Sequence, residues 1–359
     1  MTTSRSAPVV AGNDVPLAHF TTLRLGGTVG RLIQAGSAEE VAHAVGAADR
    51  SGQPVLVLGG GSNLVVADAG VPGTAVRVAN TGLAVRRDRG RALVTVEAGE
   101  EWDAVVAATL AEGLSGLECL SGIPGRSGAV PVQNVGAYGV EIAERLVDVD
   151  LYDRRAGVIR PRVPAAELGL AYRHSALKGR DDAVVLRIRL SLDDDPAGRG
   201  GPVRYAELAA TLDVPLGQCA PAARVREAVL ELRRSKGMVL DPADHDTWSA
   251  GSFFTNPVLA AGAAAPILAG DPSMPRWPQA DGRVKLSAAW LISNAGFRRG
   301  HRGPGGQVAL STRHSLALTN RGGGTTEQLL ALAREVRDGV RARFGVTLDP
   351  EPVLVGCAL

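Results

Sequence analysis

Residues 121–139 constrain the fold of this chain more than any other segment. They contain five Gly and two Pro in nineteen residues, so they form neither a helix nor a regular strand. Four apolar residues in the same stretch, Ile123, Val130, Val132 and Val135, argue against disorder. Because a long irregular segment inside a compact domain is usually functional, we expect an ordered binding loop here.

A second glycine-rich loop, Gly59-Gly-Gly-Ser-Asn63, follows the apolar run 54–58, which we interpret as a buried strand. Three glycines let the backbone approach a ligand closely and present N–H groups to an anion. The loop is not a GxGxxG fingerprint, because Leu64 takes the place of the third glycine, and no Gly-Lys-Ser/Thr of a Walker A loop follows. A bare tight turn remains the alternative for this pentapeptide alone. Two such loops in one domain favour a long ligand that carries a pyrophosphate.

Composition and charge exclude several classes of protein. A length of 359 residues suggests about two domains, and 45% hydrophobic with 21% charged residues is typical of a globular chain. The net charge is +2 with acids and bases interspersed, so we expect no nucleic-acid partner. The sequence has no signal-peptide pattern and no apolar run of spanning length, which predicts a cytoplasmic protein without a membrane partner. Three dispersed Cys and six scattered His give no metal-ligand spacing, so we expect no metal.

Hydrophobic periodicity and capping residues predict the main secondary-structure elements. The expected helices lie at about 37–51, 103–110, 221–234 and 326–344, and the expected strands at about 54–58, 64–66, 75–78, 93–96, 147–152 and 184–192. Residues 1–16 are expected to be a loose lead-in, 193–202 a loop, and 346–356 a strand-like tail. The polar, proline-containing stretch 237–247 predicts a domain boundary near 237–240.

Polar residues in two further segments are candidates for chemistry. In Ala250–Pro257, two Phe flanked by Ser252 and Asn256 would place polar groups beside an apolar surface. Taken alone, however, the segment favours a strand that ends in an Asn-Pro turn. Glu351 stands between two prolines in the tail and is either solvated or placed for catalysis. Arg173 could equally be a surface residue.

These segments together resemble the UDP-N-acetylenolpyruvoylglucosamine reductase (MurB) family of bacterial peptidoglycan synthesis. The resemblance extends over about residues 17–357, and Val203–Leu208 is similar to a segment of the longer, type I members. Any one matching segment is weak, but their number and order are specific. They are Thr21–Leu23, Gly59–Asn63, Ile123–Gly125, Pro131–Gly139, Tyr172–Arg173, Gly251–Pro257, Pro278–Gly282, Lys285–Leu286, Trp290–Ile292 and Pro350–Glu351.

The resemblance implies an α+β fold with an FAD-binding domain of the vanillyl-alcohol-oxidase (PCMH) type over residues 17–236. Its two lobes would be about 17–80 and 81–236. A separate C-terminal α+β substrate-binding domain would span 238–345, and 346–359 would be a tail returning to the active site. Neither glycine-rich loop contains His or Cys, so FAD would be bound non-covalently. The implied FAD-binding residues are Gly59, Gly60, Gly61, Ser62, Asn63, Ile123, Pro124, Gly125, Ser127, Gly128, Asn134, Gly136, Ala137 and Tyr138.

The implied activity is that of an NADPH-dependent UDP-N-acetylmuramate dehydrogenase. It reduces the enolpyruvyl ether of UDP-N-acetylglucosamine enolpyruvate to UDP-N-acetylmuramate, with hydride from reduced FAD and a proton from Ser252. Arg173 would polarise the substrate carboxylate, and Glu351 would help to neutralise the developing enol. The resemblance implies only small-molecule partners and a monomeric protein. The implied substrate-binding residues are Tyr205, Lys236, Asn256, Gln279 and His314.

Three other interpretations remain open. Another FAD-dependent oxidase of the same fold is disfavoured because it needs no proton donor such as Ser252. A non-catalytic nucleotide-sugar binder would tolerate the loss of Arg173 or Glu351, and both are present. A serine hydrolase rests only on Gly125–Ala129, which lacks the final glycine of GxSxG. Arg126 stands where the family more often has a small or apolar residue.

Overall fold

The computed structural model describes residues 9–195 and 197–359, which form two compact units. The first unit comprises the chain up to Val15 together with 29–61 and 71–239, and the second comprises 16–28, 62–70 and 240–359. The chain changes unit at 239/240, near the boundary expected from the sequence. The short segments 16–28 and 62–70 lie with the second unit and not with the remainder of the N-terminal half.

A four-stranded sheet in the order β1-β2-β5-β3 opens the first unit. Its strands are β1 (Val9–Pro16), β2 (Thr28–Ala35), β3 (Val55–Leu58) and β5 (Val71–Val78). Both β2 and β3 run parallel to β5. The expectation of a loose lead-in is wrong for residues 9–16, because β2 offers this segment a neighbouring strand that its polar composition does not reveal. Residues 1–8 lie outside the described part of the chain.

Helix α1 (Ala38–Arg50) packs on this sheet with Val41 and Val45 buried in one apolar core. Its N-terminus is capped by Ser37, whose hydroxyl accepts the Glu40 N–H at 3.1 Å. The carboxylate of Glu40 accepts the N–H of Gly36, not that of Ser37. The sequence Ser37-Ala-Glu-Glu40 has the pattern of a capping box, of which only the Ser37 half is formed.

The larger sheet of the first unit is antiparallel, in the order β12-β11-β13-β7-β6, with β8 pairing β13. Helix α2 (Trp102–Ala111) contributes Trp102, Val105 and Val106 to the core that this sheet buries. The indole N–H of Trp102 donates to Leu120 O at 3.1 Å, so this large buried ring is also satisfied as a donor. The strands are β6 (Leu83–Asp88), β7 (Arg91–Glu97), β8 (Leu114–Ser115), β11 (Leu146–Asp153), β12 (Val158–Pro164) and β13 (Ala183–Asp194).

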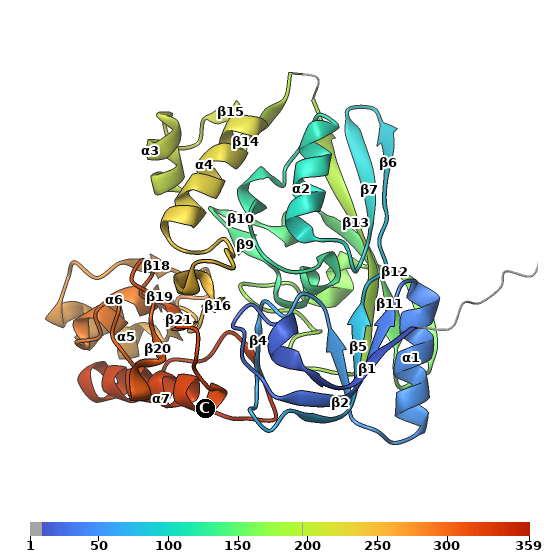
Figure 1. Cartoon of the computed structure of the whole chain (residues 1–359). Coiled ribbons are helices and arrows are strands. Elements are labelled where there is room, and N and C mark those ends of the chain that lie inside the picture. Colours follow the sequence, from blue (N-terminus) through green and yellow to red (C-terminus); the bar gives the residue numbers. More distant parts are fainter. Residues whose placement is uncertain (1–8, 196) are drawn as a thin grey trace, which may run out of the picture. The chain divides into compact units, whose positions relative to one another are not determined.

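The last part of the first unit combines two helices with a small two-stranded antiparallel sheet (Figure 1). It consists of β14 (Arg199–Pro202), α3 (Ala206–Leu212), β15 (Cys219–Pro221) and α4 (Ala222–Ser235). The loop expected over 193–202 is wrong at both ends, because β13 continues to Asp194 and β14 pairs with β15. Leu208, Val225 and Val229 pack around Cys119, and burial raises the pKa of that thiol to about 12.

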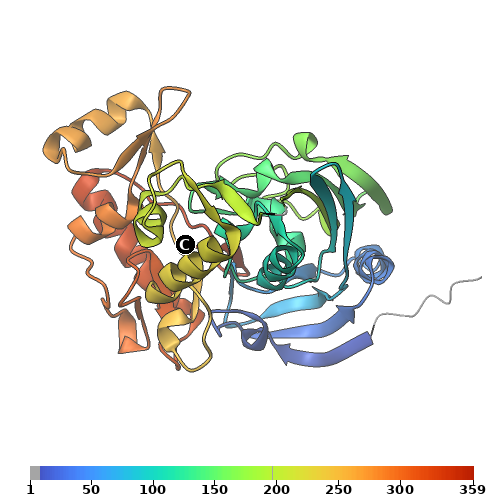
Figure 2. The ribbon, with the colours of Figure 1, turned by 90° about the horizontal axis from the view of Figure 1, so that it is seen from above.

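The second unit contains two small antiparallel sheets. The first has the order β16-β21-β20, from β16 (Ser249–Ser252), β20 (Val308–Leu310) and β21 (Ala317–Asn320), and shares a core with α6 (Ala288–Asn294) and α7 (Thr326–Phe344). The second has the order β17-β19-β18, from β17 (Val258–Leu259), β18 (Arg276–Pro278) and β19 (Val284–Leu286), and accompanies α5 (Ala261–Gly270) in the orange segment of Figure 2. The tail forms a strand only at β22 (Val353–Val355), which runs parallel to β4 (Leu64–Val66).

Short elements complete the described chain. The two-residue strands β9 (Gly136–Ala137) and β10 (Val140–Glu141) form a hairpin. The 3-10 helices are Leu17–Phe20, Glu118–Leu120, Ser127–Ala129, Pro131–Gln133, Ile142–Glu144, Ala165–Leu168, His245–Thr247 and Pro304–Gly306. None of the helices in the described residues combines the length and the apolar composition that crossing a membrane requires.

Candidate active site

The two glycine-rich loops meet backbone to backbone in the first unit. A Cβ added at Gly60 would lie 2.8 Å from Gly125 Cα, so neither loop has room for a side chain at that point. A Cβ at Gly128 would likewise lie 2.6 Å from the Cβ of Ala98. Gly59 is less restricted, since its nearest neighbour would be Arg126 Cβ at 3.7 Å. The two loops therefore lie against each other at Gly60 and Gly125, and their use as one ligand cradle stays a prediction.

Arg126, which departs from the family pattern, has a guanidinium that contacts the protein and is only partly exposed to solvent. Its Nη1 donates to Gly99 O at 3.0 Å, and its Nη2 lies 3.5 Å from a carboxylate oxygen of Glu101. Ser127 is buried, and its hydroxyl donates to Glu100 O at 3.2 Å. These contacts attach the loop to the segment that precedes α2.

Loop 121–139 contains two non-glycine residues with left-handed backbone, Asn134 (φ 46°) and Tyr138 (φ 51°). Such a conformation costs on the order of 1–3 kcal/mol for a non-glycine residue and persists only where neighbouring contacts impose it. Asn134 is fully buried, and its amide N–H groups donate to Ala171 O at 3.0 Å and to Glu141 Oε2 at 2.6 Å. Its carbonyl oxygen accepts the Ala143 N–H at 3.1 Å. The Asn134 side chain therefore connects the loop to residues 141–143 and to Ala171.

Arg173 is brought to the same loop by the turn that carries it. Its backbone is also left-handed, with φ 51°, and its Nη2 donates to Gly136 O at 2.8 Å. Ser175, two residues on, donates its hydroxyl to Val132 O at 2.5 Å. Lys178 donates to the carbonyl oxygen of Arg173 at 3.0 Å. Sequence reasoning missed Ser175 and Lys178, because neither belongs to a motif.

Three predicted ligand-binding residues from separate segments of the first unit lie together. The rings of Tyr138 and Tyr205 meet edge to face, with centroids 5.4 Å apart. Lys236 Nζ is 6.0 Å from the Tyr138 centroid and forms an ion pair with Glu207 at 2.5 Å. Burial is the main cause that raises the pKa of Tyr138 to about 12, so its hydroxyl stays protonated at neutral pH, although the cation of Arg233 opposes the shift.

In the second unit, Ser252 is the last residue of β16, and its Oγ lies 3.3 Å from His314 Nε2. Phe253 and Phe254, which follow, are both 1% exposed and belong to the core of this unit. The N–H of Glu351 donates to Phe253 O at 2.8 Å. The structure thus brings three predicted residues, Ser252, His314 and Glu351, onto adjoining segments.

The tail that carries Glu351 also joins the segment that carries Asn63. The Asn63 side-chain amide donates to Glu351 O at 3.3 Å, and Val353 N–H donates to Asn63 O at 2.9 Å. Ser62 and Asn63 belong to the second unit, so the loop Gly59–Asn63 passes from one unit to the other. The pairing of β22 with β4 continues this contact, which explains why the chain returns to this place.

Two predicted substrate-binding residues make other contacts. Asn256 Oδ1 accepts the Ala288 N–H at 2.9 Å and so satisfies a backbone donor in the first turn of α6. Gln279 lies in the turn between β18 and β19, and its amide donates to Trp277 O at 2.8 Å. These strands form a different sheet from the one that carries Ser252.

A buried carboxylate that the sequence analysis did not single out, Asp246, holds the segment before His314. It accepts hydrogen bonds from Ser311, Thr312, Arg313 and Arg321. Burial alone would raise its pKa, but the N–H of Thr312 and the hydroxyls of Ser311 and Thr312, together with Arg313, outweigh it, and the pKa lies below its usual range.

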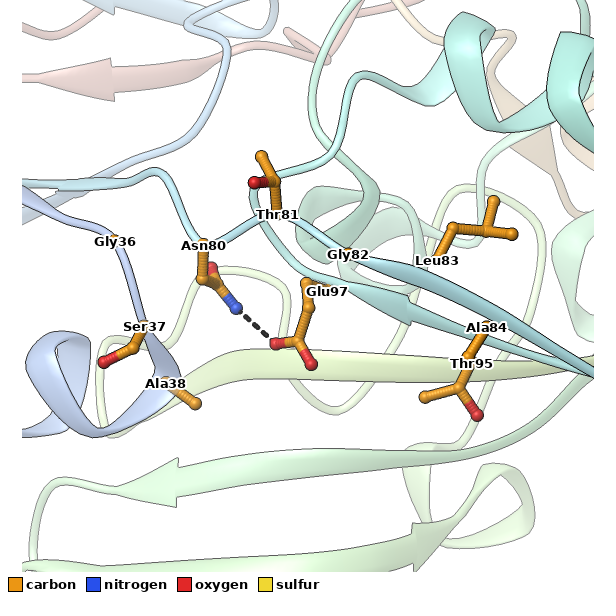
Figure 3. A pocket seen from close by; sticks show the side chains of 10 residues that line it. All are labelled: Gly36, Ser37, Ala38, Asn80, Thr81, Gly82, Leu83, Ala84, Thr95 and Glu97. Atoms are coloured by element: carbon orange, nitrogen blue, oxygen red, sulfur yellow. Dashed lines mark hydrogen bonds between the residues drawn. The ribbon is translucent and has the colours of Figure 1, made fainter. Parts of the chain in front are cut away.

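A hollow of about 310 Å³ lies elsewhere in the first unit, and no predicted site residue lines it (Figure 3). Asn80 and Glu97 line it and are joined by a hydrogen bond of 2.7 Å. Its other lining residues are small or apolar apart from three hydroxyls, so the hollow has no part in the predicted site. The lining residues are Gly36, Ser37, Ala38, Asn80, Thr81, Gly82, Leu83, Ala84, Thr95 and Glu97.

Comparison with known proteins assigns the chain to a family. Residues 30–160 match the model of an FAD binding domain, and residues 241–355 match that of the C-terminal domain of UDP-N-acetylenolpyruvoylglucosamine reductase. A relative of that name from Saccharopolyspora erythraea is 61% identical over 353 residues, which cover 96% of this chain and 95% of the relative. The chain belongs to the UDP-N-acetylenolpyruvoylglucosamine reductase family.

Other members of this reductase family are similarly close. The relative from Salinispora arenicola is 54% identical and covers 96% of the chain. The crystal structure of the reductase (MurB) from Thermus caldophilus superimposes with a TM-score of 0.66 at 26% identity, and covers 97% of this chain and 99% of that one. The family, the FAD cofactor and the α+β fold, with an FAD-binding domain followed by a reductase C-terminal domain, are confirmed. The individual roles of the site residues stay predictions.

Proposed function

We propose that this protein is an NADPH-dependent UDP-N-acetylmuramate dehydrogenase. It reduces UDP-N-acetylglucosamine enolpyruvate to UDP-N-acetylmuramate, a precursor of peptidoglycan. The observation that carries the proposal is the Ser252 hydroxyl in contact with His314 and beside the Glu351 segment, in a chain that is 61% identical to a reductase of this name. A proton donor on a segment that adjoins an acidic residue suits the reduction of an activated double bond.

The glycine-rich loops fit the diphosphate of a flavin nucleotide. An added Cβ at Gly60 would lie 2.8 Å from Gly125 Cα, so the two loop backbones pack directly against each other. Glycine-rich loops of this kind can present backbone N–H groups to an anion. Gly59–Asn63 and residues 123–138 would hold FAD without a covalent bond, since neither loop offers a His or Cys. When bound, FAD supplies the two-electron transfer between NADPH and the enolpyruvyl group.

Arg173 is assigned to the substrate carboxylate. During reduction, negative charge builds up on the carbon beside that carboxylate, and a fixed guanidinium stabilises it without reorganisation. The hydrogen bond from Arg173 to Gly136 O and the left-handed turn at Arg173 hold the side chain before any substrate arrives. Such preorganisation supports the assignment.

Ser252 is assigned the proton transfer to the same carbon, and Glu351 the neutralisation of the developing enol. A hydroxyl is a weak acid in water, so this role needs a strongly basic acceptor and a dry surrounding. The buried rings of Phe253 and Phe254 directly after Ser252 support the second condition. The contact with His314 gives the hydroxyl a defined orientation.

Lys236 and Tyr205 are assigned to the diphosphate and sugar of the substrate. Lysine binds phosphate as a point charge, and the nearby tyrosine pair offers ring surface and hydroxyl groups. Asn256, Gln279 and His314 stay predicted contacts. We expect a monomer that works in the cytoplasm, where NADPH and nucleotide sugars are found.

The direct test is the visible absorption spectrum of the purified protein together with turnover. We expect an acid-releasable flavin, bleaching of its absorption by NADPH, and reoxidation on addition of UDP-N-acetylglucosamine enolpyruvate with formation of UDP-N-acetylmuramate. A protein that binds no flavin, even after incubation with FAD, would contradict the proposal. Reoxidation by dioxygen but not by the enolpyruvyl substrate would instead indicate an oxidase.

A further inference from the structure

Asp246 collects five hydrogen bonds at one buried carboxylate. It lies in the 3-10 turn His245–Thr247, and only 5% of its surface is exposed. Four of the bonds come from three consecutive residues: the Ser311 hydroxyl at 2.9 Å, the N–H and hydroxyl of Thr312 at 3.0 Å each, and Arg313 Nε at 3.1 Å. Arg321 Nη1 adds a further bond at 2.7 Å.

Ser311 extends this anchorage to His314. The Ser311 side chain is fully buried, and its oxygen accepts the N–H of Arg313 at 3.0 Å and the N–H of His314 at 3.1 Å. A continuous chain of hydrogen bonds therefore leads from the Asp246 carboxylate through Ser311 to the backbone of His314. The imidazole of His314 in turn contacts Ser252 Oγ at 3.3 Å.

We propose that Asp246 is a positioning residue of the reaction: by fixing residues 311–314 it holds the His314 imidazole against the Ser252 hydroxyl. The inference rests on the proposed function, in which Ser252 is the proton donor. In that step the Ser252 O–H bond breaks, a C–H bond forms, and the oxygen must afterwards regain a proton. Both events need Oγ to stay in one hydrogen bond with a group that can give or take a proton.

A variant of the neighbouring Asp244 can distinguish this positioning role from a simple ion pair with Arg313. Asp244 also forms an ion pair with Arg313, and its side chain accepts the Asp246 N–H, but neither contact reaches Ser311 or Thr312. Asp244→Asn therefore removes a carboxylate that lies beside the turn of Asp246 and pairs with the same residue, Arg313. It leaves in place the hydrogen bonds that Asp246 accepts from the Ser311 and Thr312 hydroxyls and from the Thr312 N–H, which makes it a matched control.

The test measures the two half-reactions separately, by stopped-flow absorbance of FAD-loaded protein. For Asp246→Asn we expect flavin reduction by NADPH within about twofold of wild type, and flavin reoxidation by the enolpyruvyl substrate slowed at least about tenfold, the scale of a displaced catalytic group. Asp244→Asn should change neither rate by more than about twofold. Equal losses in both half-reactions, or equal effects of the two variants, would overturn the proposal.

Ser311→Ala tests the same link if Asp246→Asn does not fold. This variant keeps the carboxylate and both arginines but removes the acceptor of the His314 N–H. We expect a selective slowing of reoxidation, smaller than that of Asp246→Asn, and unchanged reoxidation would overturn the proposal. Ser252→Ala serves as the reference: if it leaves reoxidation intact, the assignment of the proton donor fails. If it slows reoxidation while Asp246→Asn and Ser311→Ala do not, only the positioning role fails.

Discussion

Loop 121–139 of the first unit and loop 311–314 of the second are held in different ways. The first is tied down at several independent points along its length: Gly122 N–H bonds Asp103 at 2.6 Å, Ser127 bonds the Glu100 segment, and Asn134 bonds two further segments. The second has backbone hydrogen bonds to Gly300 and Ala317 and an ion pair to Asp244, but three consecutive residues bond the same buried carboxylate, that of Asp246. We therefore expect the first loop to tolerate the loss of one of its separate anchors, and the second to be displaced when the carboxylate shared by three of its residues is removed.

The two arrangements suit different kinds of chemistry. At the first loop, the close contact of Gly60 with Gly125 leaves no room for a side chain, and in the proposed function the backbone there meets the cofactor. At the second, the side chains of His314 and Ser252 must keep one relative position for proton transfer. The first loop is thus sensitive to added volume, and the second is sensitive to the removal of a charge.

Among the variants that alter how residues of the first unit are held, the largest effect is expected from Gly60→Ala. The added Cβ would lie 2.8 Å from the backbone of Gly125, so the loops must separate. Overpacking of this kind costs about 1–3 kcal/mol, which corresponds to FAD binding that is weaker by roughly ten- to hundredfold. Titration of the apoprotein with FAD, followed by flavin fluorescence, measures the change.

Gly59→Ala is the control, because the nearest neighbour of its added Cβ would be 3.7 Å away. Equal FAD affinities of the two variants would contradict a cradle that is shaped by the contact of Gly60 with Gly125.

A smaller effect is expected from Asp103→Asn. Its carboxylate binds Arg226 through two N–H groups and accepts the Gly122 N–H, but it is 39% exposed, so we expect a loss of only about 1 kcal/mol, or about 2–4 °C in Tm. Both half-reactions should stay within about twofold of wild type, because other anchors hold the loop. A selective loss of one half-reaction in Asp103→Asn would contradict the claim that loop 121–139, unlike loop 311–314, tolerates the loss of one anchor.

The Tm difference between wild type and Asp103→Asn should depend on pH in a definite direction. Burial alone would raise the pKa of Asp103, but the bonds from Arg226 and Gly122 lower it below its usual range. A carboxyl with a lowered folded pKa contributes stability above its unfolded pKa of about 3.9 and loses it as the pH falls through the folded pKa. The Tm difference between wild type and Asp103→Asn should be full at pH 7 and should shrink below about pH 4. A constant difference down to pH 3 would contradict this explanation.

The smallest effect is expected from Glu207→Gln. This variant tests whether one carboxylate, that of Glu207, controls the Lys236 side chain in the first unit. Glu207 pairs with Lys236 at a partly exposed position, where an ion pair contributes about 0–1 kcal/mol. Freed from this competitor, Lys236 should bind the substrate diphosphate roughly two- to fivefold more tightly, with lower KM and unchanged kcat. Glu231→Gln, at an exposed position of α4, is the control. A raised KM in Glu207→Gln would mean that Glu207 supports Lys236 in binding.

The elements that could be predicted best have strong local signals. Helix α7 spans Thr326–Phe344 as predicted, because a long amphipathic pattern is bounded by the Thr325 cap and Gly345. The seven-residue helices α3 and α6 were missed, since two turns are too short to show a period. Strand β1 was missed because its partner β2 lies beyond the segment, and pairing decides its structure.

The site divides in the same way. Gly60, Gly125 and their neighbours could be predicted because clustered glycines in an irregular, partly apolar segment are typical of a backbone that must approach a ligand closely. The network of Asp246 could not, because its partners Ser311 and Arg321 lie 65 and 75 residues away and are ordinary polar residues by themselves. Glu141, Ser175 and Lys178 were missed for the same reason. Only the fold joins them to the residues that they hold.

The central claim is that the first unit binds the redox cofactor and that Ser252 of the second unit delivers the proton. Stopped-flow measurement of both half-reactions in FAD-loaded Ser252→Ala tests it most directly. We predict that NADPH reduces the flavin at a rate within about twofold of wild type, while reoxidation by UDP-N-acetylglucosamine enolpyruvate is slowed by about 10²–10⁴-fold, the usual contribution of general acid catalysis. Equal slowing of both half-reactions, or normal reoxidation, would contradict the claim.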